Sequence, residues 1–377
     1  MRVSLVDPVS YTLPYDSNLA AGLAKRGHEV DLLAASFPHA PPPAANGYTH
    51  REVFFTASAR VLARVPRSRI RLAVKGLEYL PNVTRLKRTI RELDPDVLHV
   101  QWLGVPQLDR RWVRDAAAAR PVVFTAHDVL PKRTEHRDDL WREIFGLVDR
   151  VVVHGSGAVE RLVALGVDRE RIARIPHPLF AAASETEIRP PRGSTLLHFG
   201  LLRSSKGLDV LLKALPQIAA AVPEVKLVVA GDPLEPVDPL QTLADRLGVA
   251  SQVDWRLGYV QEGELPPLMD EATAVVLPYR RIESSGVLAA ALGHGRPAVV
   301  TDVGSLGETV REFGAGLVVA PEDPAALAAA CIQLLTDERA LEEAFAGTRR
   351  ARDVLTWDAA AEAHEELYED VLADRRS

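Results

Sequence analysis

Short apolar stretches alternate with helical patterns along the whole chain, and this alternation restricts the fold more than any other feature. Parallel sheets that are covered by helices on both faces have this pattern. The expected strands of the first half are Arg2 to Val6, Glu29 to Ala34, Val97 to Gln101, Pro121 to Thr125 and Arg150 to His154. Those of the second half are Thr195 to Phe199, Lys226 to Ala230, Val253 to Leu257, Ala274 to Leu277, Ala298 to Thr301 and Gly316 to Val319. We therefore predict an α/β protein with two doubly wound parallel sheets.

The length of 377 residues exceeds that of a usual single domain and predicts about two domains. We place an N-terminal domain at residues 1–178 and a C-terminal domain at residues 194–355. Residues 179–193, where Pro, Ala and Glu are frequent, are predicted to be the linker. Residues 356–377 are predicted to form a C-terminal amphipathic helix. Ligands of such sheets bind beyond the carboxyl ends of the strands, so we expect two facing domains with one cleft at their seam.

Composition excludes several classes of protein. The net charge of -6 argues against nucleic acid as a general partner. The one cysteine, Cys331, excludes a disulfide framework. The chain starts with a strand-like sequence instead of a signal peptide, and no apolar run approaches the roughly eighteen residues of a membrane span. We expect a soluble, cytoplasmic protein.

The turn after the expected strand at 195–199 carries two cations, Arg203 and Lys206. Leu208, Leu211 and Leu212 then recur at helical spacing, which places both cations at a helix N-terminus. That end already has unpaired N–H groups and a positive partial charge, so added cations repel it unless an anion joins them. Phosphate is the natural anion. A solvated loop that happens to hold Arg and Lys is the alternative.

A second loop has complementary chemistry. The apolar strand that ends at Pro278 leads to Glu283 and then to Ser285, Gly286 and Val287, which open an Ala- and Leu-rich helix. Backbone N–H groups of this small-residue turn can bind a diphosphate, and the Glu283 carboxylate can accept hydrogen bonds from sugar hydroxyls. The two loops would suit the two ends of one nucleotide sugar.

With these motifs in this order, the chain resembles the nucleotide-sugar-dependent glycosyltransferases of family four (glycosyl transferases group 1), in the subtype with a Ser-Gly-Val donor loop. The resemblance is carried by Phe199-Gly200, Arg203, Lys206-Gly207, Gly258-Tyr259-Val260, Leu265-Pro266, Leu277 to Arg280, Ser285 to Leu288, and Gly295 to Gly304 with Glu308. The first half is similar more loosely, through Leu19 to Val30, Thr125 to Asp128 and Ile175 to Pro178. The resemblance implies a GT-B fold of two Rossmann-like domains, with the C-terminal helix at residues 356–377 returning to the N-terminal domain. It also implies retaining transfer of a hexosyl group from a UDP- or GDP-type sugar to an acceptor hydroxyl, without a metal or other cofactor.

The resemblance also implies roles for individual residues. Arg203 and Lys206 would stabilise the departing diphosphate, and Glu283 would orient the donor sugar. His127, directly after a strand of the first domain, would contact the transferred sugar. Further donor contacts are expected at Gly200, Gly231, Tyr259, Val260, Ser285, Gly286, Val287 and Glu308. Each of three residues also has a structural explanation. Gly231 could simply form a turn, Glu308 could be an acid that favours the start of a helix, and His127 could be a structural histidine.

The first domain would receive the acceptor, and we expect Ser10, Tyr11 and Asp16 to contact it. Their loop lacks the pair of glycines that is usual in the family, so a glycan, a glycolipid and a small metabolite all stay open as acceptors. A second departure is Ala291, which stands where most of the family has a glutamate that reaches the nucleotide ribose. We interpret Ala291 as a mark of the subtype.

The sequence predicts no metal site. Its only Asp-x-Asp string, Asp94-Pro95-Asp96, precedes a strand, where Pro and Asp simply end a helix. The histidines at 154, 177, 198 and 294 lack metal-ligand spacing. No carboxylate pair stands out either, and by the resemblance the leaving phosphate can itself accept the acceptor's proton.

Residues 60–91 contain ten Arg or Lys residues and one acid, Glu78, with apolar positions between them. Such a segment could touch anionic lipid at the inner face of the membrane, or could be a solvated helix face. We expect at most peripheral membrane contact.

Two other functions would use the same architecture. A catalytically silent nucleotide-sugar-binding protein would suit Ala291, and would bind a donor without forming product. A GT-B sugar epimerase or phosphorylase is the other alternative. Phosphorolysis of the known type needs a lysine-bound pyridoxal cofactor, so a colourless protein would argue against it.

Overall fold

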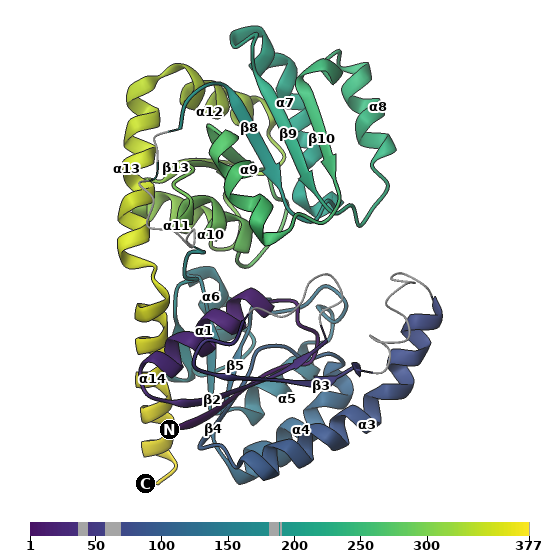
Figure 1. Cartoon of the computed structure of the whole chain (residues 1–377), viewed down its shortest axis with the longest axis vertical. Helices are drawn as coiled ribbons and strands as arrows, with labels where there is room; N and C mark the ends of the chain where they lie inside the picture. Colours follow the sequence, from purple (N-terminus) through teal and green to yellow (C-terminus); the bar gives the residue numbers. More distant parts are fainter. Residues whose placement is uncertain (37–43, 57–68, 181–187, 189–190, 377) are drawn as a thin grey trace. The chain divides into compact units, whose positions relative to one another are not determined.

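A computed structural model describes residues 1–36, 44–56, 69–180, 188 and 191–376. The chain divides into two compact units (Figure 1). Unit 1 comprises Met1–His154, Ala158–Pro176 and Trp357–Ser377, and unit 2 comprises Gly155–Gly157 and His177–Thr356. Within the predicted linker, residues 181–187 and 189–190 lie outside the described residues.

Unit 1 is built on a parallel sheet with the strand order β3-β2-β1-β4-β5-β6-β7. Its strands are β1 (Arg2–Asp7), β2 (Glu29–Ala35), β3 (Thr49–Phe54), β4 (Val97–Val100), β5 (Val122–Thr125), β6 (Arg150–Val153) and β7 (Ile172–Arg174). Its helices are α1 (Leu13–Lys25), α3 (Arg69–Leu93), α4 (Pro106–Ala119), α5 (Asp138–Leu147), α6 (Ser156–Ala164), the 3₁₀ turn η1 (Arg169–Arg171) and α14 (Trp357–Asp374). The five strands expected from the sequence are present. The edge strands β3 and β7 were not predicted, because β3 buries only Val53 and Phe54 and β7 has three residues.

Unit 2 has a second parallel sheet, with the order β10-β9-β8-β11-β12-β13. The strands are β8 (Thr195–Phe199), β9 (Lys226–Gly231), β10 (Val253–Leu257), β11 (Ala274–Leu277), β12 (Ala298–Thr301) and β13 (Gly316–Val319). The α-helices are α7 (Leu208–Ala221), α8 (Asp238–Arg246), α9 (Leu265–Glu271), α10 (Gly286–Gly293), α11 (Leu306–Phe313), α12 (Pro324–Thr336) and α13 (Glu338–Val354). The 3₁₀ turns are η2 (Ser204–Lys206), η3 (Ala250–Gln252) and η4 (Glu262–Glu264). All six strands match the expected ones within a residue.

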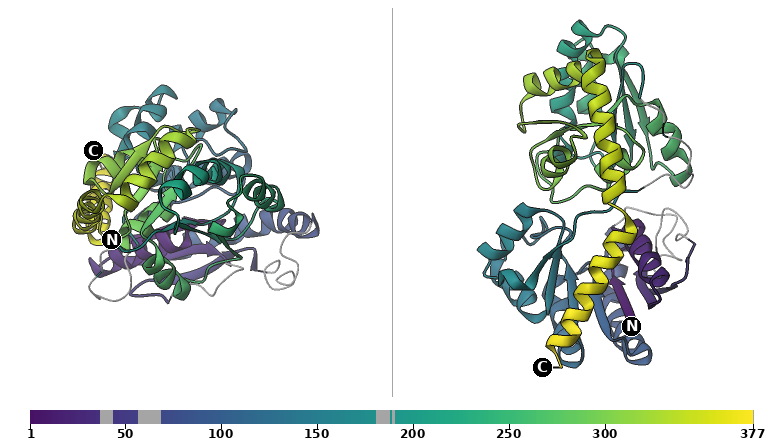
Figure 2. Two further views of the ribbon diagram at one scale, coloured as in Figure 1. Left: turned by 90° about the horizontal axis from the view of Figure 1, so that it is seen from above. Right: turned by 90° about the vertical axis from the view of Figure 1, so that its left-hand side faces the viewer.

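Alternating residues of the unit 2 strands enter two separate cores. Leu196 of β8 lies in a cluster with α7 and α12, whereas the next residue, Leu197, lies in a cluster with α10 and α11. Side chains of a strand point alternately to its two faces, and here helices cover both (Figures 1 and 2). This double burial explains why the strands are continuous apolar runs.

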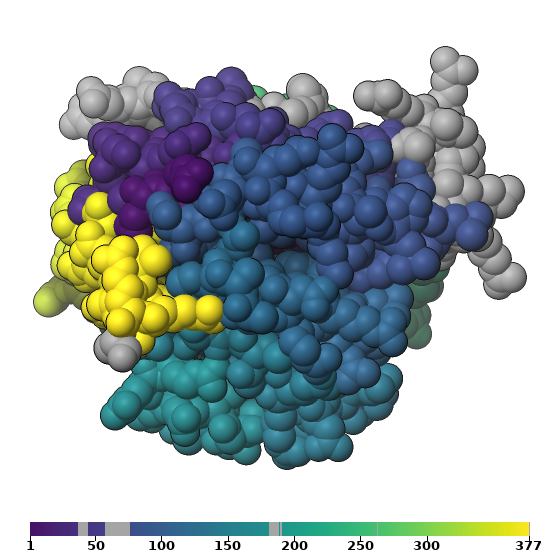
Figure 3. All heavy atoms as spheres, turned by 90° about the horizontal axis from the view of Figure 1, so that it is seen from below, coloured from purple at the N-terminus to yellow at the C-terminus, as the bar shows by residue number. Residues whose placement is uncertain are grey.

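The last helix, α14, packs on unit 1. Lys25 of α1 donates to Asp358 at 2.8 Å, and Arg26 pairs with Glu362 at 3.4 Å. In the space-filling view of Figure 3 this C-terminal segment, in yellow, lies beside the purple N-terminal residues. Among the described helices, none combines the length and apolar character needed to cross a bilayer.

The strand order indicates where each sheet is expected to bind a ligand. In each sheet the order along the chain reverses at one point, between β1 and β4 in unit 1 and between β8 and β11 in unit 2. The loops at the carboxyl ends of strands next to such a reversal form the usual ligand site of open α/β sheets. The loops after β8 and β11 are those that carry Arg203, Lys206 and Glu283.

Candidate functional site

The two predicted cations of unit 2 lie at a helix N-terminus. Arg203 is exposed and extended, the turn η2 ends at Lys206, and α7 begins at Leu208. The residue before α7 is Gly207, which has no side chain to cap the helix. This end of α7 therefore combines backbone N–H donors, a positive partial charge and two nearby cations, which favours an anion.

Lys206 is held on the ring of Tyr279. Its Nζ lies 3.7 Å from the ring centroid, and only 8% of Lys206 is exposed. Burial raises the pKa of Tyr279 above its usual value, while Ser285 and the charge of Arg203 oppose that rise. Tyr279 thus holds Lys206, from the loop after β8, against the loop after β11, which also carries Ser285. A cation fixed on an aromatic face is pre-positioned for an incoming anion.

Ser285 caps α10. Its hydroxyl accepts a hydrogen bond from the N–H of Leu288 at 3.3 Å, so the first turn of α10 starts at Gly286 with its earliest N–H groups outside the helix ladder. Ser285 is buried, Gly286 is exposed and Val287 is half-buried. The predicted small-residue turn is therefore the N-terminus of a helix, as a diphosphate site would need.

Two glycines let the strand ends approach closely. Gly207 has φ +67°, and a Cβ built on it would lie 1.9 Å from the carbonyl oxygen of Pro278. Gly231 has φ +141°, and its Cβ would lie 1.8 Å from the carbonyl oxygen of Gly200. Neither position has room for a side chain. Glycine at position 231 is thus required by the packing of β9 against the loop after β8, and this requirement leaves the predicted donor contact a prediction.

The other predicted donor residues of unit 2 are spread over three loops. Tyr259 is exposed after β10, and Val260 packs against one of the two apolar cores. Glu283 is half-buried, and its carbonyl accepts from the N–H of Ser305 at 2.8 Å. Glu308 lies in the first turn of α11, a favourable place for an acid. These positions neither require nor exclude contact with a ligand.

In unit 1, His127 follows β5 and is buried among residues from neighbouring strand ends. Its Nε2 lies 3.0 Å from Oε1 of Gln101, and its Nδ1 lies 3.2 Å from Nε2 of His154. The ring stacks on Trp102, with centroids 5.4 Å apart, and meets Tyr15 edge-on. Both ring nitrogens therefore face protein groups, so a hydrogen bond to a ligand requires exchanging one of these contacts.

His154 determines which nitrogen of His127 carries hydrogen. Its Nδ1 donates to the carbonyl of Ile175 at 2.9 Å, since a carbonyl oxygen only accepts. Burial lowers the pKa of His154 to about 4, so the ring is neutral near pH 7 and its Nε2 is an acceptor. The facing Nδ1 of His127 must then be the donor.

The loop after β1 is fixed by buried polar groups. Asp7 accepts from the N–H of Ser10 at 2.8 Å, and the hydroxyl of Ser10 donates to the carbonyl of Ala35. Ser10 has φ +52°, a strained conformation for a residue with a side chain. Tyr11 is 71% exposed, whereas Asp16 is fully buried. Burial and the neighbouring Asp7 raise the pKa of Asp16 well above its usual value, so this carboxyl holds the loop instead of facing solvent.

Ala291 lies in the core of unit 2, with no exposed surface, among the apolar side chains of α10 and α11. A carboxylate in this place would be buried. Among the described residues, no group of three or more His, Cys, Asp or Glu side chains could hold a metal ion.

Sequence reasoning missed several residues that build these sites. Tyr279 was noted only as part of a motif, and Gln101, Trp102 and His154 were given no role. Each follows directly after a buried strand, and this position was the available signal, because neighbouring parallel strands end at one edge of the sheet. Lys213, Glu235 and Glu322, which enter a network described below, gave no such signal.

Comparison with known proteins decides the family. Residues 193–337 match the family described as "Glycosyl transferases group 1", and residues 17–179 match "Glycosyltransferase Family 4". The chain belongs to the family-four glycosyltransferases. Its two matched segments fall on the two parallel-sheet units, and the family inferred from the sequence is confirmed.

The relatives of this glycosyltransferase include the phosphatidyl-myo-inositol mannosyltransferase of Mycolicibacterium smegmatis, 28% identical over 90% of this chain and 86% of the relative. The D-inositol 3-phosphate glycosyltransferase of Thermomonospora curvata is 27% identical over 94% of this chain and 89% of the relative. Sucrose-phosphate synthase from Thermosynechococcus elongatus has a similar fold, with a TM-score of 0.76 and 19% identity over 99% of this chain and 100% of that one. Anabaena HepE in complex with UDP and glucose has a TM-score of 0.73 and 18% identity, over 98% of this chain and 100% of that one. The predicted GT-B fold is thus confirmed.

Proposed function

We propose that this glycosyltransferase transfers a hexosyl group from a nucleoside diphosphate sugar to an acceptor hydroxyl, with retention of the anomeric configuration and without a metal ion. The observation that carries the proposal is Lys206 on the Tyr279 ring, with Arg203 in the same loop as Lys206 and Ser285 at the start of α10. Two cations and two helix N-termini suit a diphosphate.

Departure of the diphosphate is the step these residues assist. As the bond between the sugar's anomeric carbon and the phosphate oxygen breaks, negative charge grows on the phosphate, and fixed cations with N–H groups of α7 and α10 stabilise it. The acceptor oxygen then forms the new bond to that carbon, and its proton passes to the leaving phosphate. In this scheme the two side-chain cations take the place of a divalent metal.

The proposal also assigns contacts with the donor sugar and the acceptor to individual residues. Glu283 accepts hydrogen bonds from sugar hydroxyls, and the pocket for the base includes Tyr259 and Val260. His127 contacts the transferred sugar by exchanging the contact of its Nε2 with Gln101. Tyr11 contacts the acceptor, while Ser10 and Asp16 hold its loop in shape. The named relatives are mannosyl- and glycosyltransferases acting on inositol-containing molecules, so GDP-mannose, UDP-sugars and inositol derivatives are the first compounds to test.

The test begins with binding of UDP, GDP and their hexose derivatives by calorimetry in the presence of EDTA. We expect Arg203→Ala and Lys206→Ala each to weaken diphosphate binding at least about tenfold, because each removes a charge-assisted contact. Arg246→Ala, which removes an exposed arginine of α8 in the same unit, is the matched control. Unchanged affinity in both site variants would refute the proposal, and the anomeric proton coupling of the product reports on retention.

A peripheral membrane contact is proposed for α3. Leu77 and Leu80 are 80% and 71% exposed on this helix, whereas Lys87 and Arg88 pair with Asp115 and Glu92. Residues 60–68 of the predicted basic segment lie outside the described residues. We expect the wild-type protein to co-sediment with anionic vesicles and the double variant Leu77→Ser/Leu80→Ser to stay in the supernatant. Equal sedimentation of the wild type and the double variant would contradict the contact.

A further inference from the structure

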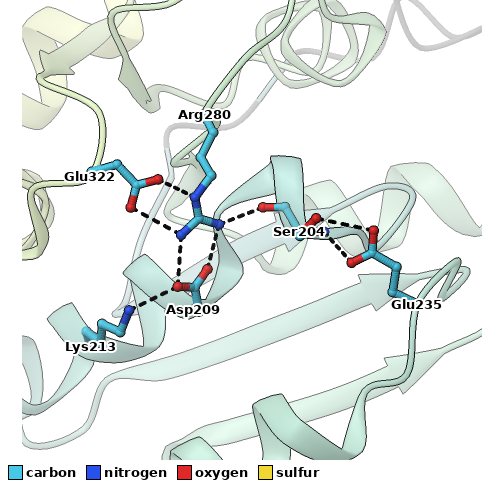
Figure 4. A network of polar contacts seen from close by, with 6 residues as sticks. All are labelled: Ser204, Asp209, Lys213, Glu235, Arg280 and Glu322. Carbon is cyan, nitrogen blue, oxygen red and sulfur yellow. Dashed lines mark hydrogen bonds and ion pairs between the residues drawn. The ribbon is translucent and has the colours of Figure 1, made fainter. Parts of the chain in front are cut away.

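Arg280, in the loop after β11, joins three segments of unit 2. Its guanidinium donates to both carboxylate oxygens of Asp209, at 2.7 and 2.9 Å, and also pairs with Glu322 at 3.1 Å (Figure 4). The same group donates to the carbonyl of Ser204 at 2.6 Å. One side chain therefore connects its own loop with η2, with the first turn of α7 and with the segment after β13.

The backbone reinforces this connection. The N–H of Arg280 donates to the carbonyl of Ser205 at 2.9 Å, and Gly207 packs on the carbonyl of Pro278, as described above. On the far side of η2, Glu235 accepts from the N–H of Ser204 at 2.8 Å. The segment from Arg203 to Gly207 is thus held from both sides (Figure 4).

The charged side chains of this network pair with one another. Arg280 and Lys213 face the carboxylates of Asp209 and Glu322, and hydrogen bonds from Arg280 and Lys213 lower the pKa of Asp209 to about 2. Asp209 is therefore ionised at neutral pH. Arg280 is 29% exposed, and its planar fork is already occupied by two carboxylates and a carbonyl. An ammonium group could not bridge these partners in the same way.

Glu322, the second carboxylate that pairs with Arg280, has a strained backbone. Its φ is +59°, which is uncommon for a residue with a side chain. Such strain persists only where the surrounding contacts hold it, and it often occurs beside functional loops. In this conformation the Glu322 carboxylate is paired with Arg280.

We propose that Arg280 is a positioning residue for diphosphate recognition: bridging Asp209, Glu322 and the Ser204 carbonyl, it holds the loop of Arg203 and Lys206 in its binding geometry without contacting phosphate itself. The inference rests on the proposed function, because it assigns the diphosphate to this loop. A group misplaced by about 1 Å can cost a factor of 10² in a reaction, so the position of the loop matters as much as its charges.

The two roles that an arginine can have here predict opposite effects of Asp209→Asn. If Arg280 contacted phosphate directly, removing a competing carboxylate would free its charge, and diphosphate would bind more tightly. If Arg280 positions the loop, the same substitution breaks the bridge, and diphosphate binds more weakly. Glu322→Gln gives the same contrast with a milder change, and serves if Asp209→Asn does not fold.

The experiment measures the affinities of the full chain for the nucleoside diphosphate and the matching monophosphate by calorimetry. We expect Asp209→Asn and Arg280→Met each to weaken diphosphate binding about tenfold or more. Both should also lower the ratio of diphosphate to monophosphate affinity. Arg280→Lys, which keeps the charge, should not restore diphosphate affinity to the wild-type value. Lys213→Met removes an exposed partner of Asp209 that does not touch the loop, and should change binding less than about twofold.

Four results would overturn the inference. Tighter diphosphate binding in Asp209→Asn would make Arg280 a direct ligand, and full rescue by Arg280→Lys would show that charge alone suffices. If Asp209→Asn and Arg280→Met leave the ratio of diphosphate to monophosphate affinity unchanged while Arg203→Ala still weakens diphosphate binding, the proposed function stands and only the positioning role of Arg280 is refuted. A wild-type chain that binds no nucleoside diphosphate would refute the proposed function, and the inference with it.

Discussion

Two glycines offer a matched test of how tightly the loop of Arg203 and Lys206 packs on the end of β11. Gly207 and Gly248 have nearly the same φ, +67° and +70°. A Cβ at Gly207 would lie 1.9 Å from the carbonyl oxygen of Pro278, whereas a Cβ at Gly248 would meet no heavy atom within 4 Å. Alanine at either position adopts the same left-handed conformation, and only Gly207→Ala also forces backbone atoms apart.

The expected magnitudes follow from these two terms. The left-handed conformation costs alanine about 1–2 kcal/mol at both positions. Forcing an extra carbon into a packed place adds about 1–3 kcal/mol at Gly207 alone. We therefore expect Gly207→Ala to lose about 1–3 kcal/mol more free energy of unfolding than Gly248→Ala.

Urea unfolding of the two variants and the wild type measures this difference, and calorimetry with a nucleoside diphosphate measures its consequence for binding. At a temperature where both variants are folded, Gly207→Ala should bind the diphosphate more weakly and Gly248→Ala should bind like the wild type. Equal loss of stability in the two variants would refute the close packing of the loop on Pro278.

Three further predictions concern single residues. Asp209 has a folded pKa of about 2, below its unfolded value, so its ion pairs contribute stability above about pH 4 that is lost as the pH falls toward 2. The difference in unfolding free energy between wild type and Asp209→Asn should shrink over that range, and a constant difference would contradict the pairing. Ala291→Glu should destabilise unit 2 by about 3 kcal/mol or more in urea unfolding, because it buries a carboxylate among apolar side chains; a stable variant with tighter donor binding would contradict this. Tyr11→Ala should change stability by less than about 0.5 kcal/mol and raise the KM for the acceptor but not for the donor, and an unchanged acceptor KM in steady-state assays would remove Tyr11 from the acceptor site.

Regular, buried elements could be predicted from the sequence. The strands β8, β9 and β11 are apolar runs because helices cover both of their faces, and the run itself is the signal. Edge strands lack this signal. β3 is mostly polar and was missed, since only its last two residues are buried.

The candidate site was predictable in its charges but not in its packing. Arg203 and Lys206 were found because a strand, a turn and a helix follow one another in the sequence. Their relation to Tyr279 depends on strands β8 and β11 being neighbours in the sheet, which no local pattern records. The partners of Arg280 are further apart still, since Asp209 and Glu322 come from segments after different strands. Likewise Asp16 was expected to face the acceptor, and its burial beside Asp7 appears only in the folded chain.

The location of the diphosphate is the most direct test of the whole account. A crystal structure of the chain with bound UDP or GDP should place the phosphate oxygens within hydrogen-bond distance of Arg203, Lys206 and the N–H groups at the start of α10, with Arg280 still paired to Asp209. A diphosphate bound away from the loops after β8 and β11 would contradict it.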